Sequence, residues 1–380
     1  MAPSASSTPA WAEVSLGALE RNLKHLQKLA RPSGLFAMVK ANAYGHGLVP
    51  ASKAFLRAGA YGLAVAFPEE GLALREAGVT RPILVVAPVL KEAVPALLKA
   101  KLIPQISSYE GALEISLAAK RLKLHSVAVQ VEVDTGMGRV GFRPDEIARD
   151  LGRLWKLSNL RIEAFYAHFA TADWTDSRYA AHQAEIFERV LAQVRLFLND
   201  AKKKTPSHLA NSAALLTRAL RVPAAWARPG LALYGVSPSA KLQNRAALTP
   251  AMQLKARVSH LKNIEKGESV SYGRTFFAPR RVKVATLGIG YADGLHRALS
   301  NKGHCLVRGR KVPLIGTVCM DMTMADVTRV PGVKNGDTAT LFGRDGKAVL
   351  PVEEQASRAG TIPYELLCAV GGRVPRIYGR

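Results

Sequence analysis

Met38-Val39-Lys40-Ala41-Asn42-Ala43-Tyr44-Gly45-His46-Gly47 is the most informative stretch of the sequence. The apolar residues from Leu35 to Val39 predict a short buried strand, after which the chain turns through small and polar residues. Lys40 ends that strand, where parallel α/β proteins place functional groups. Burial lowers the pKa of an ammonium group, and the neutral amine can attack an aldehyde to form a Schiff base. On these residues alone, a Schiff-base lysine and a surface lysine before a glycine-containing loop are equally good interpretations.

Strands and helices alternate from this stretch onward. The predicted strands are Leu35–Val39, Tyr61–Ala66, Ile83–Ala87, Leu102–Ile106, Val127–Val133, Leu160–Tyr166, Ser207–Leu209 and Ala225–Ala227. The predicted helices are Trp11–Leu29, Leu48–Ala58, Pro68–Glu76, Lys91–Ala100, Tyr109–Arg121, Pro144–Leu157, Arg178–Leu198 and Ser212–Leu220. Eight β/α units within about 200–250 residues predict an α/β fold, a (β/α)8 barrel of parallel strands.

Near residue 240 the pattern changes to short strands without helix-length spacers. These strands are Met252–Leu261, Val282–Ile289, His304–Val307, Val312–Gly316, Met322–Val327 and Thr338–Phe342, with a late helix over Val352–Ala359. We therefore predict three parts: a loose N-terminal tail over residues 1–10, a cofactor-binding barrel over 11–240 and a mainly-β C-terminal domain over 241–380.

Composition narrows the class of protein. Among 380 residues, 48% are hydrophobic and 22% charged, as in ordinary globular proteins. No apolar run approaches the roughly twenty residues of a membrane span, and residues 1–9 lack the pattern of a secretion signal. The three cysteines are an odd number without metal-ligand spacing, which predicts no metal site and a location in the reducing cytoplasm.

The net charge of +24 is unusual and has two readings. Nucleic-acid binding would need a basic, aromatic-rich stripe or a known motif, and neither is present. The basic residues are scattered, and the densest cluster, Lys202-Lys203-Lys204, falls in a predicted surface turn after a helix. Solvated surface charge is therefore the favoured interpretation.

Residues that follow the predicted barrel strands would meet at one mouth of the barrel. They are Lys40 after the first strand, Asp134–Arg139 after the fifth, His168 after the sixth, Asn211 and Ser212 after the seventh, and Arg228–Gly230 after the eighth. Ser212, Gly230 and Leu231 lie where this fold commonly binds phosphate. A Schiff-base lysine beside a phosphate site indicates pyridoxal 5′-phosphate. Each residue alone has a structural interpretation, and their joint placement favours a site.

These residues resemble those of the alanine racemases, pyridoxal-phosphate enzymes with a barrel and a β-domain. The resemblance runs from about Trp11 to Tyr378, and Val39–Gly47 resembles the family's cofactor-lysine signature. The other similar blocks are Asp134–Phe142, His208–Ser212, Arg228–Gly235, Ser271–Thr275, Gly290–Gly294 and Cys319–Met322. So many blocks in the same order would not arise by chance.

The resemblance implies a two-base mechanism. Lys40 would form the aldimine with the cofactor and act as the base on one face of the substrate Cα, and Tyr272 would act on the opposite face. Racemisation needs such a pair, because one group removes a proton and another delivers one from the other side. The family pattern places Tyr272 on a neighbouring subunit, which implies a homodimer with a shared active site.

The resemblance also assigns contacts to cofactor and substrate. Arg228 would meet the pyridine nitrogen, with His208 supporting Arg228 and His168 packing on the ring. Tyr44, Ser212, Tyr364 and the amides of Gly230 and Leu231 match phosphate contacts, and Asn211 is a further cofactor-binding residue. Arg139 and the Met320 N–H would meet the substrate carboxylate. Tyr291, joined by Asp321 and Arg297, would line the access corridor.

Two departures from the family pattern stand out. Glu132 occupies a position where many members carry a lysine, often carbamylated, that orients the arginine. A glutamate is anionic without modification, so we hypothesise that Glu132 replaces the carbamate and holds Arg139; the alternative is a strand glutamate that faces another partner. Leu295-His296 replaces the usual Tyr-Pro, which leaves the substrate range open.

The sequence thus predicts a cytoplasmic, pyridoxal-phosphate-dependent alanine racemase that supplies D-alanine for peptidoglycan. The alternatives are a racemase of broader range that acts on serine or other small amino acids, and a non-catalytic pyridoxal-phosphate carrier. The predicted second domain with Tyr272 disfavours the carrier, since a carrier needs no second base. Neither nucleic acid nor membrane is expected as a partner.

Overall fold

A computed structural model describes residues 8–199, 205–217, 224–242 and 245–379. The chain folds into two compact units. The barrel unit contains Leu19–Ala43 and Leu48–Thr249; the C-terminal unit contains the described residues up to Ala18, Tyr44–Gly47 and those from Pro250 onward. The domain bounds predicted at residues 10 and 240 stay predictions. Most of the predicted tail, together with Lys202-Lys203-Lys204, lies outside the described residues.

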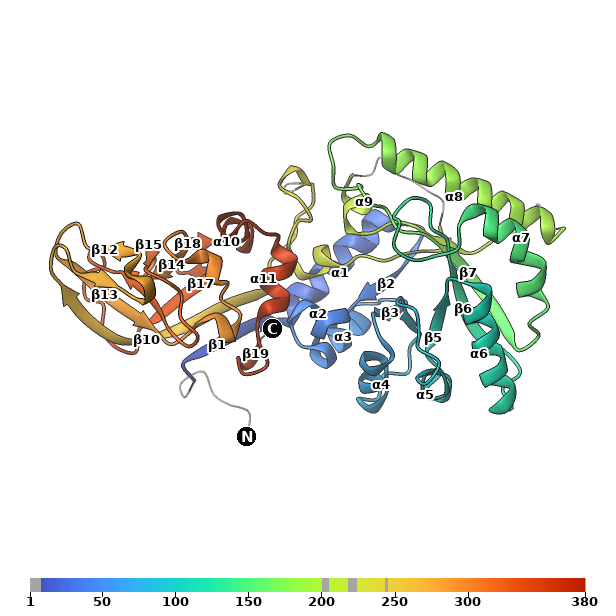
Figure 1. The fold of residues 1–380 in the computed structure, drawn as a ribbon, viewed down its shortest axis with the longest axis horizontal. Coiled ribbons are helices and arrows are strands. Elements are labelled where there is room, and N and C mark those ends of the chain that lie inside the picture. Colours follow the sequence, from blue (N-terminus) through green and yellow to red (C-terminus); the bar gives the residue numbers. More distant parts are fainter. Residues whose placement is uncertain (1–7, 200–204, 218–223, 243–244, 380) are drawn as a thin grey trace. The chain divides into compact units, whose positions relative to one another are not determined.

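The barrel unit is built on eight parallel strands, in the order β8-β7-β6-β5-β4-β3-β2-β9 (Figure 1). Their bounds are β2 Gly34–Met38, β3 Gly62–Val65, β4 Ile83–Val85, β5 Ile103–Ile106, β6 Val127–Glu132, β7 Leu160–Tyr166, β8 Ser207–His208 and β9 Trp226–Ala227. Two backbone hydrogen bonds, from Ala225 N to Ser207 O (2.9 Å) and from Arg228 N to Ala210 O (2.8 Å), join the segments of β8 and β9. Because β8 and β9 are the two ends of the strand order, these bonds close the ring. The predicted (β/α)8 class is confirmed.

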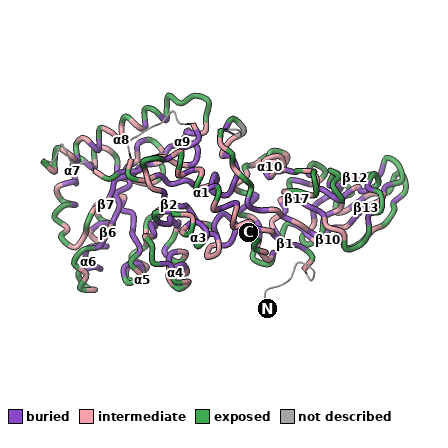
Figure 2. Tube along the Cα trace, turned by 180° about the vertical axis from the view of Figure 1, so that it is seen from behind, coloured by how far each residue is buried: buried purple, intermediate pink, exposed green. Residues whose placement is uncertain are grey.

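Helices follow the strands and cover the outside of the barrel. Their bounds are α1 Leu16–Ala30, α3 Leu48–Arg57, α4 Pro68–Glu76, α5 Val94–Lys99, α6 Tyr109–Arg121, α7 Pro144–Trp155, α8 Arg178–Phe197 and α9 Ser212–Thr217. Short 3-10 turns follow at η1 Leu231–Tyr234 and η2 Ala240–Leu242. The strands are the most buried part of this unit (Figure 2). Leu35, Phe36 and Leu63 are fully buried. Each helix therefore turns its apolar face to the sheet.

The helix predicted over Trp11–Leu29 is wrong at its start. Residues Ala10–Ser15 form strand β1, and α1 begins at Leu16. Strand β1 pairs with β10 (Met252–Ile264) and with β19 (Arg376–Gly379). The pairing partners lie some 240 or more residues away along the chain, so tertiary pairing overrides the local helical pattern.

The C-terminal unit is a nine-stranded sheet in the order β18-β17-β14-β15-β16-β13-β10-β1-β19. The further strands are β13 Val282–Leu287, β14 His304–Val307, β15 Arg310–Ile315, β16 Thr323–Asp326, β17 Thr338–Asp345 and β18 Ala348–Leu350. An additional pairing of β17 with β10 closes six of these strands into a ring. The remaining elements are η3 Tyr272–Arg274, η4 Tyr291–Asp293, η5 Arg297–Leu299, α10 Val352–Ala359 and α11 Pro363–Ala369. The predicted mainly-β character is confirmed.

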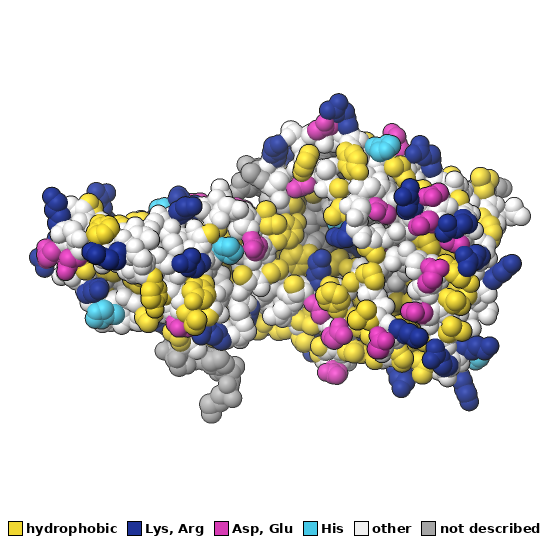
Figure 3. Space-filling view, in the orientation of Figure 1, with side chains coloured by type: hydrophobic (Ala, Val, Ile, Leu, Met, Phe, Trp, Pro, Cys, Tyr) yellow, Lys and Arg dark blue, Asp and Glu magenta, His cyan; other side chains and the backbone are white. Residues whose placement is uncertain are grey.

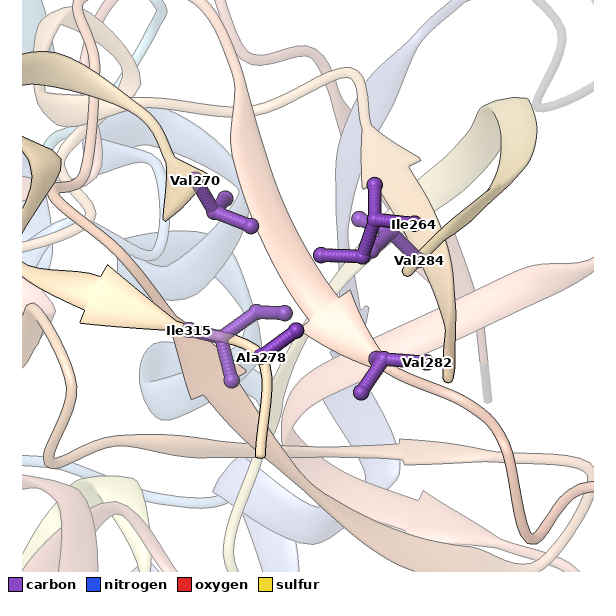
Figure 4. Packing of buried hydrophobic residues seen from close by; sticks show 6 residues of the cluster. All are labelled: Ile264, Val270, Ala278, Val282, Val284 and Ile315. Carbon is purple, nitrogen blue, oxygen red and sulfur yellow. The ribbon is translucent and has the colours of Figure 1, made fainter. Parts of the chain in front are cut away.

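A small hairpin of β11 (Ser269–Val270) and β12 (Phe276–Phe277) packs on this sheet. Its core consists of Ile264, Val270, Ala278, Val282, Val284 and Ile315 (Figure 4). Because these side chains bury the base of the hairpin, its tip at Tyr272–Arg274 is held on a packed support.

Charged side chains are mixed on the surface. On the face drawn in Figure 3, lysines and arginines are spread among acidic residues and do not gather in one patch. This distribution agrees with the interpretation of the +24 charge as solvated surface charge. Within the described residues, no helix has both the length and the apolar character needed to span a membrane.

Candidate active site at the strand ends of the barrel

Lys40 is the second residue after β2, and its side chain is half-buried. The strand end is fixed by its neighbours: Met38 N donates to Pro229 O at 3.1 Å, and the Tyr234 hydroxyl donates to Met38 O at 2.8 Å. From Lys40 to Tyr44 (α2) the chain makes a left-handed turn, with φ of +52° to +54° at the four residues after the lysine. The motif thus forms a tight turn at the strand end, where the sequence places it.

Arg228 follows β9 and is held by a buried network. Its guanidinium donates to His208 Nδ1, to His208 O at 3.0 Å and to Ala167 O at 2.6 Å. An arginine can only donate, so His208 Nδ1 must be the acceptor. His208 Nε2 therefore carries the proton and donates to Gln130 Oε1 at 2.8 Å. Burial first, and then the Arg228 charge, hold the pKa of His208 well below its usual value, which keeps the ring neutral.

The donor set of Arg228 fits the predicted cofactor. Arg228 is 4% exposed, and three of its five N–H groups are used by the contacts within the described residues. Two donors are left for a further acceptor, and leaving buried donors unpaired is costly. A pyridine nitrogen is an acceptor of the required kind.

Tyr166 and Glu132 form the next part of this network. The Tyr166 hydroxyl donates to Glu132 Oε2 at 2.9 Å, and its ring stacks on His208 with centroids 4.8 Å apart. Arg228 lies over the Tyr166 ring at 4.7 Å. Burial is the main cause that raises the pKa of Glu132, opposed by the Tyr166 bond and by the charges of Arg228 and Arg139. Among the described residues, Glu132 makes no ion pair with Arg139, so its direct partner is Tyr166.

His168 follows β7 and shows that the predicted barrel residues gather. Its pKa is lowered to about 3, first by burial and then by the charges of Arg228, Arg139 and Lys40. These three cations from different strand ends thus act on one imidazole. His168 is neutral at physiological pH, and Arg139 is exposed at the mouth.

Two residues of α8 that sequence reasoning missed hold the loops of this site. Gln183 is fully buried; its amide nitrogen donates to His168 O at 3.0 Å and, weakly, to Thr135 Oγ1 at 3.4 Å. Its amide oxygen accepts from Ala170 N at 2.9 Å. One turn earlier, the Tyr179 hydroxyl donates to Gly136 O at 2.8 Å. The spacing of four residues places both side chains on one helix face, which was the available sequence signal.

Ser212, Gly230 and Leu231, three of the predicted phosphate residues, lie after β8 and β9. Ser212 Oγ accepts from Gly230 N at 2.8 Å and from Ala232 N at 3.3 Å, which joins the two loops. Asn211 Oδ1 accepts from Ala214 N at 3.0 Å and caps α9. Leu231 is buried at the start of η1. Hydroxyl and backbone N–H groups are thus concentrated here, and they are the donors that phosphate requires.

Tyr44 and Tyr364 belong to the C-terminal unit. Their ring centroids are 6.0 Å apart. Burial first, and then the neighbouring Tyr364 and Cys368, raise the pKa of Tyr44 far above its usual value. The Tyr44 hydroxyl therefore remains a proton donor across the physiological range.

Tyr272 and Met320 lie on neighbouring loops of the C-terminal unit, and both are exposed, at 73% and 52%. Ser271, with φ of +68°, has a strained backbone directly before Tyr272. Its hydroxyl donates to Thr317 O at 2.6 Å, while the Thr317 hydroxyl donates to Tyr272 O at 2.8 Å. These bonds fix the backbone at the tip and leave the tyrosine side chain directed to the exterior of the unit.

Arg373, which sequence reasoning also missed, bridges two loops of the C-terminal unit. It donates to Asp293 Oδ1 and to Asp321 Oδ1, both at 2.6 Å. The same loops are joined by backbone bonds from Tyr291 N to Cys319 O and from Ala292 N to Met320 O, each 3.0 Å. The predicted corridor residues Tyr291 and Asp321 are thus brought together with Met320, and Tyr291 is 44% exposed.

Comparisons with known proteins point to one family. The family models of the alanine racemase N-terminal and C-terminal domains match residues 14–238 and 251–378. A curated alanine racemase from Halothermothrix orenii is 41% identical over 371 residues, which cover 97% of each chain.

Solved structures agree with this assignment. The crystal structure of alanine racemase from Bacillus anthracis with bound L-Ala-P is 36% identical, with a TM-score of 0.91 and coverage of 100% of this chain and 96% of that chain. Alanine racemase from Bartonella henselae with covalently bound pyridoxal phosphate gives 28% identity and a TM-score of 0.86, with coverage of 98% and 100%. The resemblance predicted from the sequence motifs is confirmed, and the chain belongs to the alanine racemase family.

Proposed function

We propose that this protein interconverts L- and D-alanine, with Lys40 and the partner subunit's Tyr272 as proton-transfer groups on opposite faces of the substrate Cα. The observation that carries the proposal is that Lys40 and Arg228 follow strands of one parallel barrel, and that their charges and that of Arg139 all lower the pKa of His168. An amine, two guanidiniums and a flat uncharged ring at one barrel mouth suit an amino-acid substrate and an aromatic, anionic cofactor.

Pyridoxal 5′-phosphate is the proposed cofactor, and when bound it withdraws electrons from Cα and makes the Cα–H bond acidic. Lys40 would hold its aldehyde group and Arg228 its ring nitrogen. A guanidinium gives up its proton reluctantly, so the ring nitrogen would stay unprotonated. His168 would pack on the ring. The proposed phosphate contacts are Tyr44, Ser212, Tyr364, Gly230 and Leu231, with Asn211 capping the adjacent helix.

The homodimer with a shared site is part of this proposal. The exposure of Tyr272 and Met320 supports it, since a second subunit could receive both side chains. The partner subunit's Met320 N–H would join Arg139 at the substrate carboxylate, and its Tyr291 and Asp321 would line the access corridor. Arg139 is suited to the carboxylate because a planar guanidinium can form two parallel hydrogen bonds with it.

Mixed dimers of two inactive variants test the shared site. Lys40→Ala and Tyr272→Phe are purified separately, mixed under conditions of proven subunit exchange, and assayed for alanine racemisation by circular dichroism. We expect each variant alone to be inactive and the mixture to recover activity, because half of the sites in a mixed dimer then have both groups. No recovery despite exchange would show that the two groups do not act across an interface.

Glu132 is proposed to supply the anion that a carbamylated lysine supplies in relatives. The charges of Arg228 and Arg139 both act to lower the pKa of Glu132, which supports this role. The hydrogen bond of Glu132 is made with Tyr166. Glu132→Gln should raise KM for alanine, because the neutral amide removes the negative charge that interacts with Arg139 and Arg228. Glu163→Gln, on the neighbouring strand β7, is the matched control. Equal KM values in the two variants would refute the role.

D-alanine for peptidoglycan in the cytoplasm is the proposed use of the reaction. None of Cys305, Cys319 and Cys368 forms a disulfide, which is compatible with a reducing compartment. The second candidate is a racemase of broader range. It is favoured by Leu295-His296, which stand where family members often carry Tyr-Pro. His296 Nε2 lies 3.4 Å from Glu365 Oε1. Racemisation rates with alanine, serine and valine distinguish the two.

A further inference from the structure

The turn that follows Lys40 is strained. Ala41, Asn42, Ala43 and Tyr44 have φ values of +52°, +54°, +54° and +52°. A left-handed helical conformation costs roughly 1–2 kcal/mol for each residue with a Cβ, and asparagine tolerates it best. Four such residues in succession persist only where surrounding contacts compensate for the strain.

Glu70, in the first turn of α4, provides such a contact. Its Oε1 atom accepts from Ala41 N at 2.6 Å, and its Oε2 atom accepts from Ala66 N at 2.8 Å and from Phe67 N at 3.3 Å. The carboxylate thus joins the first strained residue after Lys40 to the end of β3 and the start of α4. Hydrogen bonds to an ionised acceptor are among the strongest in proteins.

Two other hydrogen bonds of the turn are local in sequence. Ala43 N donates to Val39 O at 2.8 Å, and Asn42 Oδ1 accepts from Leu48 N at 2.7 Å. These bonds stabilise the turn itself. Glu70 comes from the next β/α unit, so its bond can fix where the turn lies relative to the neighbouring strand.

We propose that Glu70 is a positioning residue for Lys40: its carboxylate stabilises the left-handed turn through the Ala41 N–H and so sets the place of the lysine. The proposal rests on the proposed function of Lys40. The competing explanation is that Glu70 caps α4 through Ala66 and Phe67 and has no effect beyond the stability of that helix.

The experiment compares Glu70→Gln with Glu69→Gln, an exposed neighbour in the same helical turn. An amide cannot offer acceptors on both of its ends, so Glu70→Gln loses the bonds on one side. We expect about a tenfold loss in affinity for added pyridoxal 5′-phosphate and in kcat, as for loss of a charged hydrogen bond. Glu69→Gln should match the original protein. Equal values for the two variants would overturn the proposal.

Ala41→Gly separates positioning from capping. Glycine adopts positive φ without steric cost, so the strain at the residue that Glu70 holds is removed and the turn depends less on Glu70. We expect the loss caused by Glu70→Gln to shrink several-fold in the Ala41→Gly background, whereas a capping role predicts the same loss in both backgrounds and would overturn the proposal. Lys40→Ala, measured in parallel, tests the proposed function separately. If it keeps activity and cofactor affinity, the role of Lys40 fails; if it loses them while Glu70→Gln does not, the positioning role alone fails.

Discussion

His208 presents an unprotonated Nδ1 atom to the guanidinium of Arg228. This tautomer is set from the other side of the ring, where Nε2 donates to Gln130 Oε1 at 2.8 Å. Because burial and the Arg228 charge keep the pKa of His208 low, the imidazole supports Arg228 without adding a second positive charge. The orientation of Arg228 therefore depends on a neutral amide on β6.

Replacing Gln130 with leucine should destabilise this network. The substitution keeps the approximate volume but leaves His208 Nε2–H buried without its acceptor. An unsatisfied buried donor costs about 1–3 kcal/mol, and the ring can then change tautomer and lose its bond with Arg228. We expect a lower free energy of unfolding in urea and weaker binding of pyridoxal 5′-phosphate.

Gln105 provides the matched control. Gln105 lies on strand β5, directly opposite Gln130 of the adjacent strand β6, and is 3% exposed. Neither of its side-chain polar atoms has a hydrogen-bond partner among the described residues. Gln105→Leu removes buried polar atoms that make no bond, so it should be neutral or stabilising. If the two leucine variants have equal stability, the bond to His208 contributes nothing.

The barrel could be predicted because its signals are local. Pro68–Glu76 and Tyr109–Arg121 are helices with the predicted bounds, and the second begins after Ser108, whose hydroxyl accepts from Gly111 N at 3.0 Å. Capping residues and apolar periodicity act over a few residues, so they are visible in sequence. Strand β1 was not visible as a strand, because its partners are strands at the other end of the chain.

The residues of the candidate site also divide into those that local sequence signals predict and those that only tertiary structure shows. Lys40, His168 and Arg228 lie within two residues of the ends of predicted strands, so their convergence follows from the fold class. Gln183 and Arg373 act through bonds to loops distant in sequence, and local patterns do not show which loops these are. They become visible only when tertiary structure places a buried amide or a guanidinium between two functional loops.

Gln183→Leu should impair substrate binding. The leucine cannot bond to His168 O, Thr135 or Ala170, so the loop that leads to Arg139 keeps the Tyr179–Gly136 bond to α8 but loses the support of Gln183. We expect KM for alanine to rise about tenfold, as for loss of a buried hydrogen bond, with a smaller change in kcat. The exposed neighbour His182→Ala is the control, and steady-state kinetics measure both. A Gln183→Leu enzyme with unchanged KM would exclude a positioning role.

Arg373→Gln should loosen the loop that carries Met320. The guanidinium is half-exposed, and its two ion pairs raise its own pKa. Solvent screens exposed ion pairs and makes each of them weak, so the expected rise in KM is small, about twofold to fivefold. Arg344→Gln, an exposed arginine on β17, should leave KM unchanged. The prediction fails if both variants give the same kinetics as the original protein.

His168 should make stability depend on pH. Its folded-state pKa of about 3 lies below the ordinary value of 6.5, chiefly because of burial. Between these values the unfolded chain binds a proton at this histidine and the folded protein does not. The free energy of unfolding therefore falls as the pH decreases from about 6.5 toward 3, by up to about 1.4 kcal/mol for each pH unit.

Urea unfolding of the cofactor-free protein at a series of pH values measures this dependence. In His168→Gln the histidine contribution is absent, so the free energy of unfolding should fall less steeply as the pH is lowered. The slope will not vanish, because the pKa of buried His208 is shifted in the same direction. Above about pH 6.5 neither the folded nor the unfolded state protonates His168. The free energy of unfolding should therefore change with pH equally in the two proteins there. Identical slopes below that pH would mean that His168 is protonated equally in the folded and unfolded states.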